Sequence, residues 1–235
     1  MIRNKKPYFG IVVFPGTNCE ADCHYVLKNI LAVDCKYIWH MEKEDKEINA
    51  IIIPGGFSYG DYLRSGAVAK FSPIMNFVRD FAAGGGLVIG ICNGFQILLE
   101  ENILPGAMLR NNTLKFICRY AYMKVEKASN PFTANYKVGD IIRMPIRHNE
   151  GNYYINSEGL EKLERNEQIL LRYCNAEGNI NSNSNPNGSI SNIAGICNEN
   201  KNVFGLMPHP EACCEKILGS EDGLKIFHSM IDNII

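Results

Sequence analysis

The feature that most constrains this chain is a cysteine set between two glycines, where an apolar run meets a helical pattern. The segment reads Gly90-Ile91-Cys92-Asn93-Gly94. The apolar run at 87–91 predicts a buried strand, and the apolar residues recurring over 95–99 predict a helix. The flanking glycines remove Cβ atoms that would clash in so tight a turn. We therefore predict that Cys92 lies on a sharp turn between a strand and a helix.

Such a turn indicates a chemical role for the cysteine. G-x-C-x-G between a strand and a helix is the cysteine form of the turn that presents a nucleophile in α/β hydrolases. Backbone N–H groups at the start of the helix favour a thiolate there. The alternative is structural, because most free cysteines are small buried hydrophobes, and the chain has nine cysteines in all.

A second segment, Pro208-His209-Pro210-Glu211, supplies a base and a carboxylate. Pro210 disfavours a helical conformation at His209, so an extended backbone is expected, with His209 and Glu211 on the same side. A carboxylate in that position fixes the imidazole tautomer while the other ring nitrogen faces a thiol. A rigid turn with no function is the alternative. Together the two segments predict a catalytic triad of Cys92, His209 and Glu211.

The remaining pattern alternates strands and helices through the first half of the chain. Strands are expected at 8–14, 33–39, 50–54 and 87–91, and helices at 19–31, 72–83 and 93–101. Further strands are expected at 116–125, 141–147, 169–173, 193–197 and 202–207, then a polar loop at 175–192 and a closing helix at 223–235. We predict an α/β fold: an open, doubly wound, mostly parallel (flavodoxin-like) sheet with helices on both faces. Some strands of the C-terminal half are expected to be antiparallel. Ligands bind outside the carboxyl ends of such strands, so Gly55-Gly56, Cys92 and His209 should converge on one cleft.

Composition excludes several function classes. Formal net charge is −1 over 235 residues, which gives no basic field for nucleic acid or anionic membrane. No segment has the length of a transmembrane helix, and the N-terminal apolar run lacks a signal-peptide pattern, so we predict a cytoplasmic chain with unpaired cysteines. Neither Cys19 and Cys23 nor Cys213 and Cys214 have the partners of a structural zinc site, and no metal is expected.

With these residues in view, the chain resembles the class I (triad) glutamine amidotransferases. Within them it is most similar to the glutaminase subunits of phosphoribosylformylglycinamidine (FGAM) synthase, an enzyme of purine biosynthesis. The resemblance covers nearly the whole chain, so residues 1–235 are expected to form a single class I glutamine amidotransferase domain. The matching blocks are 14–20, 54–64, 90–98, 148–153, 185–189 and 205–211.

The resemblance implies a reaction. Cys92 would attack the side-chain amide of L-glutamine, His209 would move the proton, and Glu211 would orient the imidazole. A γ-glutamyl thioester would form and be hydrolysed, and the ammonia would convert formylglycinamide ribonucleotide to its amidine on a synthetase subunit that uses ATP and Mg²⁺. The resemblance also implies a small bridging subunit. No cofactor is expected in this chain, which lacks the G-x-x-x-x-G-K-[ST] phosphate loop and has too little sequence for a synthetase domain.

Substrate contacts are expected beside the triad. The turn at Cys92, called the nucleophile elbow, makes the N–H of Asn93 one oxyanion donor. The Gly55-Gly56 loop is the candidate for the other, with Gly56 preferred; a plain turn is the alternative. Gln96, one helical turn past the cysteine, is expected from the family pattern to help bind glutamine, unless it is only a helix surface residue.

Two positions depart from the family pattern. The segment His148-Asn149-Glu150 has Asn149 where the family usually has glycine, and asparagine tolerates a left-handed backbone better than most residues. By similarity His148 and Glu150 lie near the glutamine site or the partner surface; a structural histidine is the alternative. Ala212 stands where an arginine often follows the Pro-Glu pair, which removes any salt bridge from that position.

Three other functions remain open from sequence. The first is an amidotransferase subunit of the same fold that serves a different synthetase. The second is a cysteine hydrolase or peptidase with the same elbow, which would need no partner. The third is a flavodoxin-like interaction subunit without activity, against which the intact Cys92, His209 and Glu211 argue.

Overall fold

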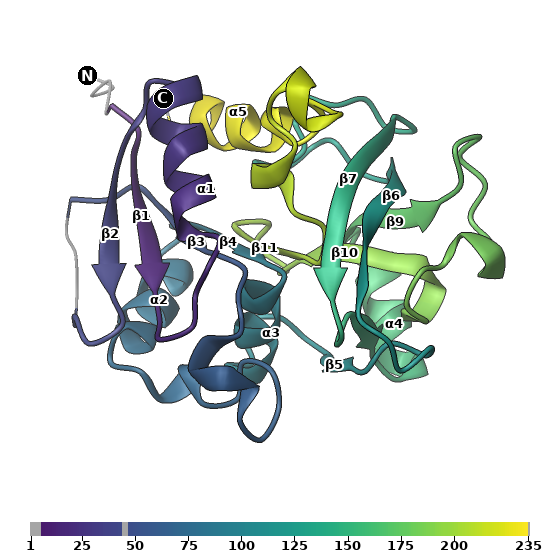
Figure 1. The fold of residues 1–235 in the computed structure, drawn as a ribbon, viewed down its shortest axis with the longest axis horizontal. Coiled ribbons are helices and arrows are strands. Elements are labelled where there is room, and N and C mark those ends of the chain that lie inside the picture. Colours follow the sequence, from purple (N-terminus) through teal and green to yellow (C-terminus); the bar gives the residue numbers. More distant parts are fainter. Residues whose placement is uncertain (1–5, 44–46, 235) are drawn as a thin grey trace.

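The structure, a computed structural model, describes residues 6–43 and 47–234. Within these residues nine strands form one mixed sheet in the order β2-β1-β3-β4-β11-β10-β9-β6-β7, and β5 and β8 form a separate antiparallel pair (Figure 1). The strands are β1 (Tyr8–Val13), β2 (Asp34–Trp39), β3 (Ala50–Ile53), β4 (Leu87–Ile91), β5 (Ala107–Leu109), β6 (Ile117–Val125), β7 (Ile141–His148), β8 (Asn152–Tyr154), β9 (Ile169–Cys174), β10 (Ile193–Cys197) and β11 (Val203–Leu206).

The helices cover both faces of the sheet. In Figure 1, α1 and α5 lie on one side of β3, β4 and β11, and α2 and α3 lie on the other. α4 packs in the half that contains the antiparallel strands. The helices are α1 (Glu20–Tyr25), which continues as a π-helical turn (Val26–Ile30), α2 (Ile74–Ala83), α3 (Asn93–Glu100), α4 (Ser157–Arg165) and α5 (Leu224–Asp232).

The amino-acid composition of the parallel strands decides which of them lie at the centre of the sheet. Every residue of β3, β4 and β11 is buried. Strands buried on both faces read as continuous apolar runs rather than as alternating patterns. β2, β1, β3, β4 and β11 are all parallel, so their carboxyl ends meet at one edge of the sheet.

The antiparallel half brings a distant strand to this edge. β10, β9, β6 and β7 follow β11 in antiparallel order. The last strand, β7, contacts the segment after β11: the N–H of His209 donates to the carbonyl of Pro145 at 2.9 Å. The sheet therefore curls, so that the carboxyl end of β7 lies beside the carboxyl ends of β4 and β11.

Most predicted elements are confirmed, as is the fold class. Three differ from expectation. The predicted helix at 19–31 changes to a π-helical turn after Tyr25, the polar loop at 175–192 contains two short 3-10 turns, and α4 with the β5–β8 pair was not predicted. Asn156 caps α4, its side chain accepting from the N–H of Gly159 at 2.8 Å. The end of the closing helix at Ile235 lies outside the described residues.

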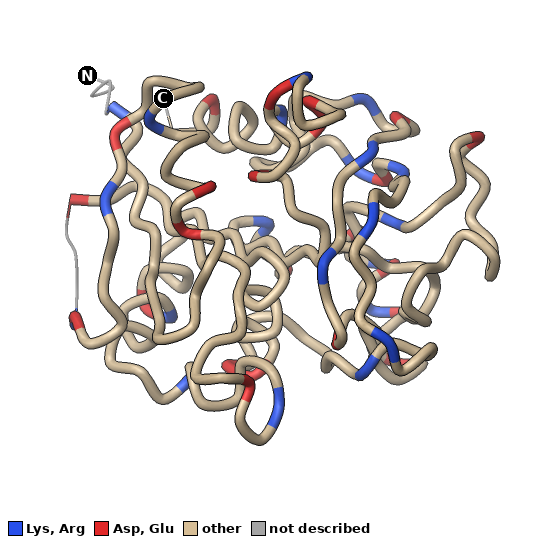
Figure 2. The backbone as a smooth tube through the Cα atoms, viewed as in Figure 1, with Lys and Arg blue, Asp and Glu red and all other residues tan. Residues whose placement is uncertain are grey.

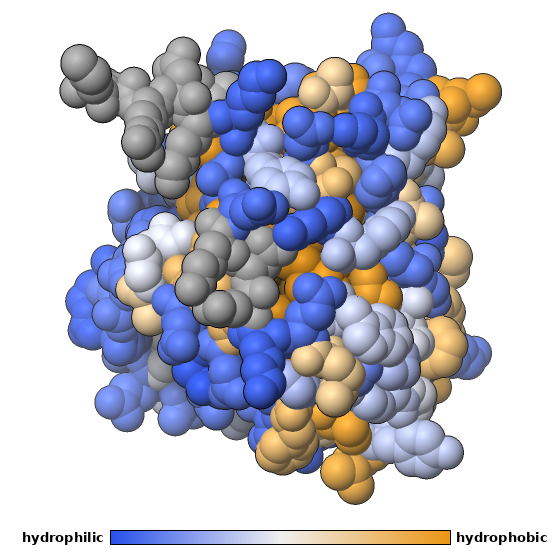
Figure 3. All heavy atoms as spheres, turned by 90° about the vertical axis from the view of Figure 1, so that its left-hand side faces the viewer, coloured by the Kyte–Doolittle hydropathy of each residue, from blue (hydrophilic) through white to orange (hydrophobic). Residues whose placement is uncertain are grey.

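Charges of both signs are scattered over the chain, with several basic residues along β6 and β7 (Figure 2). The face that carries the β2 edge is mostly hydrophilic, with apolar residues in its middle and along its lower border (Figure 3). Among the described residues, no helix has both the length and the apolar character needed to cross a membrane.

Candidate active site

Cys92 occupies a strained turn between β4 and α3. Its backbone has φ 51° and ψ −104°, a conformation that a residue with a Cβ rarely adopts. A Cβ on Gly90 would come within 2.7 Å of the backbone of Gly94, and a Cβ on Gly94 would collide with the carbonyl group of Ile53. The predicted strand–turn–helix is confirmed, and both glycines are needed because backbone lies where their side chains would be.

The backbone conformation that brings His209 and Glu211 together differs from the predicted one. Pro210 begins a 3-10 turn, Pro210–Ala212, so the extended backbone predicted across this segment is wrong beyond His209. Proline suits the first position of a helical turn, where its missing N–H is not needed. The turn still brings the carboxylate to the ring, with Nδ1 of His209 2.6 Å from Oε1 of Glu211. Both side chains are buried.

The electrostatics of the imidazole favour its protonated form. Burial lowers the pKa of His209, but Glu211 and Cys92 outweigh it, so the pKa stands well above its usual value. Within the described chain, Nε2 of His209 has no hydrogen-bond partner. The Cys92 thiol, which lies close enough to affect that pKa, donates to the carbonyl of Arg147 at 3.6 Å.

Segments that lie far apart in the sequence line one pocket of about 790 Å³. Of the predicted residues, Cys92, His209, Gly56, Gln96, His148 and Glu150 line it. They come from the carboxyl ends of β3, β4, β7 and β11 and from the first turn of α3, as the predicted convergence requires. Asp61, Ser65, Arg110 and Arg147 also line it, which gives the pocket both carboxylates and guanidinium groups.

The two glycines after β3 have different surroundings. Gly56 lines the pocket, with φ 153°, and a Cβ there would lie 2.7 Å from the carbonyl oxygen of Gly16. Gly55 instead faces the imidazole: a Cβ would lie 2.7 Å from Cε1 of His209 and 3.1 Å from Sγ of Cys19. The Gly55 carbonyl accepts from the N–H of Cys19 at 3.2 Å. Gly55 therefore allows close approach of the histidine, whereas Gly56 presents backbone to the pocket.

Asn93 and Gln96 connect the walls of the pocket. The Asn93 side chain accepts from the N–H of Ser58 at 3.0 Å and donates to Oε1 of Gln96 at 2.9 Å. Nε2 of Gln96 in turn donates to the carbonyl of Glu150 at 2.6 Å. Gln96 is only 4% exposed, so the alternative of a helix surface residue is wrong. The N–H of Asn93, in the first turn of α3, has no partner within its helix.

The segment from Arg147 to Glu150 forms the facing wall. Nδ1 of His148 bonds Oδ1 of Asn111 at 3.0 Å, while Nε2 has no partner in the described structure. Burial lowers the pKa of His148 to about 4, so its ring is neutral. Oε2 of Glu150 accepts from the N–H of Ser65 at 3.3 Å. Asn149 stands where the family usually has glycine, but its backbone is not left-handed, so asparagine is not needed here for that conformation.

Besides Ser65, Arg110 and Arg147, sequence reasoning missed Cys19 and Asp61 at this site. Sγ of Cys19 lies 3.9 Å from Nδ1 of His209, although 190 residues separate them. Asp61 lies in the pocket, where burial raises the pKa of its carboxyl to about 6, with Glu150 adding to the rise and Ser65 opposing it. The available signal was that both residues fall in the loops following β1 and β3, at the edge where ligands bind in such sheets.

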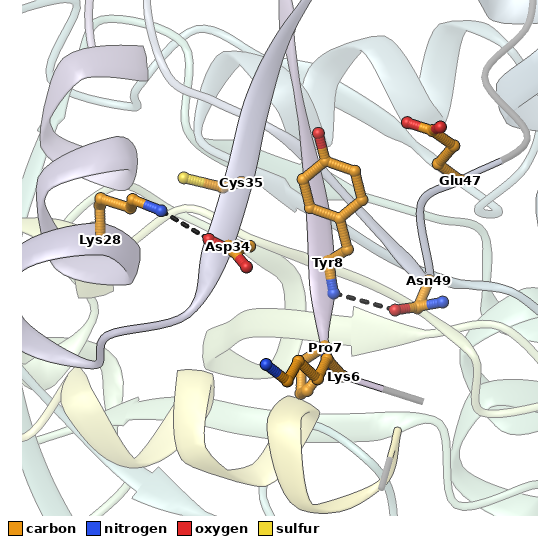
Figure 4. Close-up of a pocket in the computed structure, with 8 residues that line it drawn as sticks. All are labelled: Lys6, Pro7, Tyr8, Lys28, Asp34, Cys35, Glu47 and Asn49. Carbon is orange, nitrogen blue, oxygen red and sulfur yellow. Dashed lines mark hydrogen bonds and ion pairs between the residues drawn. The ribbon is translucent and has the colours of Figure 1, made fainter. Parts of the chain in front are cut away.

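A separate hollow lies at the opposite edge of the sheet (Figure 4). It is lined by residues at the amino ends of β1, β2 and β3, including Tyr8, Asp34 and Asn49. Lys28 and Asp34 form an exposed ion pair at 2.5 Å, and the N–H of Tyr8 donates to Oδ1 of Asn49 at 2.9 Å. This hollow contains none of the predicted site residues.

Comparison with known proteins agrees with this geometry. The family model of the CobB/CobQ-like glutamine amidotransferase domain matches residues 6–229. The phosphoribosylformylglycinamidine synthase subunits PurQ of Alkaliphilus metalliredigens and Moorella thermoacetica are 54% and 52% identical to the chain, each over 95% of both sequences. The chain belongs to the PurQ family of glutamine amidotransferases. The predicted family resemblance is thereby confirmed.

A solved relative of the PurQ chain extends the match to three dimensions. The structure of PurLQS from Thermotoga maritima contains a chain that superposes on this one with a TM-score of 0.86 at 40% identity. The match covers 98% of this chain and 100% of that one. The chain therefore shares its fold with that relative.

Proposed function

We propose that the chain hydrolyses L-glutamine with Cys92 as nucleophile, His209 as acid and base, and Glu211 as the group that orients the imidazole. The observation that carries this assignment is that Cys92 and His209 line one pocket from segments over 100 residues apart, while Oε1 of Glu211 lies 2.6 Å from Nδ1 of His209. The raised pKa of His209 favours transfer of the thiol proton to the ring. The same proton then goes to the departing ammonia, which splits amide hydrolysis into two easier steps through a thioester.

The oxyanion of each tetrahedral intermediate requires fixed donors. We assign the N–H groups of Asn93 and Gly56, because Asn93 directly follows Cys92 at the start of α3 and Gly56 lines the pocket. The Asn93–Ser58 hydrogen bond ties the two donors together, since it joins α3 to the loop after β3. The carboxylates of Asp61 and Glu150 and the guanidinium groups of Arg110 and Arg147 suit the ammonium and carboxylate of an amino acid.

The ammonia is delivered to a partner. The relative of known structure comes from PurLQS, which supports a complex of this chain with a synthetase subunit and a small bridging subunit. In this complex the synthetase subunit uses ATP and Mg²⁺ to convert formylglycinamide ribonucleotide to its amidine, and this chain contributes no cofactor. Residues 1–235 act as one amidotransferase domain, in the cytoplasm.

The test is Cys92→Ala in the assembled complex. Amidation with glutamine should be lost, whereas amidation with added ammonia should persist at the wild-type rate, because the synthetase site is untouched. Glutamine-dependent activity retained in this variant would refute the assignment of Cys92. Peptide hydrolysis by the chain alone would instead favour the cysteine hydrolase alternative.

A further inference from the structure

A second buried cysteine contacts the imidazole of the proposed triad. Sγ of Cys19 lies 3.9 Å from Nδ1 of His209, and that nitrogen lies 2.6 Å from Oε1 of Glu211. The three ligand atoms all lie within 4.8 Å of one another, and the residues Cys19, His209 and Glu211 are 5%, 2% and 3% exposed. Glutamine hydrolysis as proposed uses Cys92 and assigns no step to Cys19.

We propose that Cys19, His209 and Glu211 form an inhibitory binding site for a thiophilic divalent cation, with Zn²⁺ as the best match. Thiolate sulfur, imidazole nitrogen and carboxylate oxygen are the ligands of Zn²⁺ in proteins, at about 2.0 to 2.3 Å. Ligands at the corners of such a tetrahedron lie about 3.3 to 3.7 Å apart, with the sulfur at the longer distances. The observed 3.9 and 2.6 Å reach these values by side-chain shifts below about 1 Å.

The arrangement of these ligands is fixed by the surrounding backbone. Cys19 is anchored because its N–H donates to the carbonyl of Gly55, and its thiol donates to Oδ1 of Asn18 at 3.3 Å. The absence of a side chain on Gly55 leaves the space in which sulfur and imidazole approach. Oε2 of Glu211 is buried and has no hydrogen-bond partner among the described residues, so a ligand oxygen is available.

Binding would switch off the triad and release the protons of the two ligand atoms that carry them. A cation on Nδ1 replaces the hydrogen bond from His209 to Glu211 and holds the ring in the tautomer protonated on Nε2, so the ring cannot accept the proton of Cys92. The metal takes the place of the proton on the Cys19 thiol and of the proton on Nδ1 of His209, and both protons go to solvent. The thiolate and the carboxylate together neutralise the charge of the cation.

The direct test is Co²⁺ spectroscopy on the full chain, because cobalt reports thiolate ligation by a charge-transfer band. The wild type and Cys92→Ser should show the band, and Cys19→Ser should lose it. Cys118→Ser, which removes an exposed thiol remote in sequence from the site, is the matched control and should keep it. Glu211→Gln should weaken Co²⁺ binding by about tenfold or more. A band that persists in Cys19→Ser, or that vanishes in Cys92→Ser, would overturn the proposal.

The inhibitory role rests on the proposed function and has its own readout. Zn²⁺ should inhibit glutamine-dependent amidation by the wild-type complex, and Cys19→Ser should need about tenfold or more Zn²⁺ for the same fractional inhibition. Equal inhibition of both proteins would refute the site. Failure of the proposed function is detected separately, because Cys92→Ala would then keep its glutamine-dependent activity without any metal.

Discussion

Replacement of Gly94 by alanine should disable the site by moving α3 away from β3. The added Cβ would lie 2.7 Å from the carbonyl carbon of Ile53 and closer still to its oxygen, whereas ordinary contacts begin at 3.4 Å. The closer contact, to the oxygen, sets the displacement, so the first turn of α3 must retreat by at least about 1 Å, carrying Cys92 and the N–H of Asn93. A displacement approaching 1 Å costs about 10²-fold in rate, and overpacking costs about 1–3 kcal/mol of stability.

The assay is kcat/KM for glutamine hydrolysis in the assembled complex, alongside thermal unfolding of the chain. Gly84→Ala is the matched control. Gly84 follows α2 with φ −75°, and its nearest contact to a new Cβ is an ordinary 3.4 Å, so activity and stability should stay near wild type. Wild-type kcat/KM in Gly94→Ala would show that the close packing of α3 on β3 does not position the nucleophile.

Three further predictions concern single contacts of the site. Gly55→Ala places a Cβ 2.7 Å from Cε1 of His209 and should lower kcat about 10²-fold; unchanged kcat would show that the imidazole has room to move. Glu211→Gln should lower kcat by about 10⁴-fold, because the imidazole of His209 is no longer held in one tautomer, and circular dichroism should show an intact fold. A loss below tenfold would contradict the orienting role of Glu211. Asp61 has its carboxyl pKa raised from 3.8 to about 6, so the folded state binds more protons between these values and wild-type stability falls as pH rises through them. The thermal stability of Asp61→Asn relative to wild type should therefore increase between about pH 4 and pH 7. If the difference in stability between the two proteins did not change with pH, the raised pKa of Asp61 would be refuted.

The elbow was predictable because its determinants are local. The change from an apolar run to a helical pattern marks the junction at Cys92, and Gly90 and Gly94 stand where the structure leaves no room for side chains. The buried strands β3 and β4 were predictable for the same reason, since each is a short apolar run that ends at a turn.

Elements with weak patterns escaped prediction. β5 and β8 have three residues each, too few to show an alternation, and α4 buries only Leu163 completely in a highly charged segment. The geometry between His209 and Glu211 was mispredicted because a proline that opens a 3-10 turn has the same sequence signature as one that follows an extended residue.

Contacts made by the curvature of the sheet were beyond sequence reasoning. Cys19 reaches His209 only because β1, β3, β4 and β11 are neighbours with aligned carboxyl ends. Arg147 and His148 reach the same pocket only because the antiparallel half curls back and places β7 against the segment after β11. Neither arrangement leaves a local trace in the residues concerned.

Covalent labelling by a glutamine-like electrophile tests the central assignment most directly, because the chain contains nine cysteines that compete for the reagent. Peptide mass mapping should find a single adduct per chain, on Cys92, and His209→Ala should slow its formation sharply. An adduct on Cys19 or any other cysteine, or labelling of Cys92 at an unchanged rate in His209→Ala, would contradict the account.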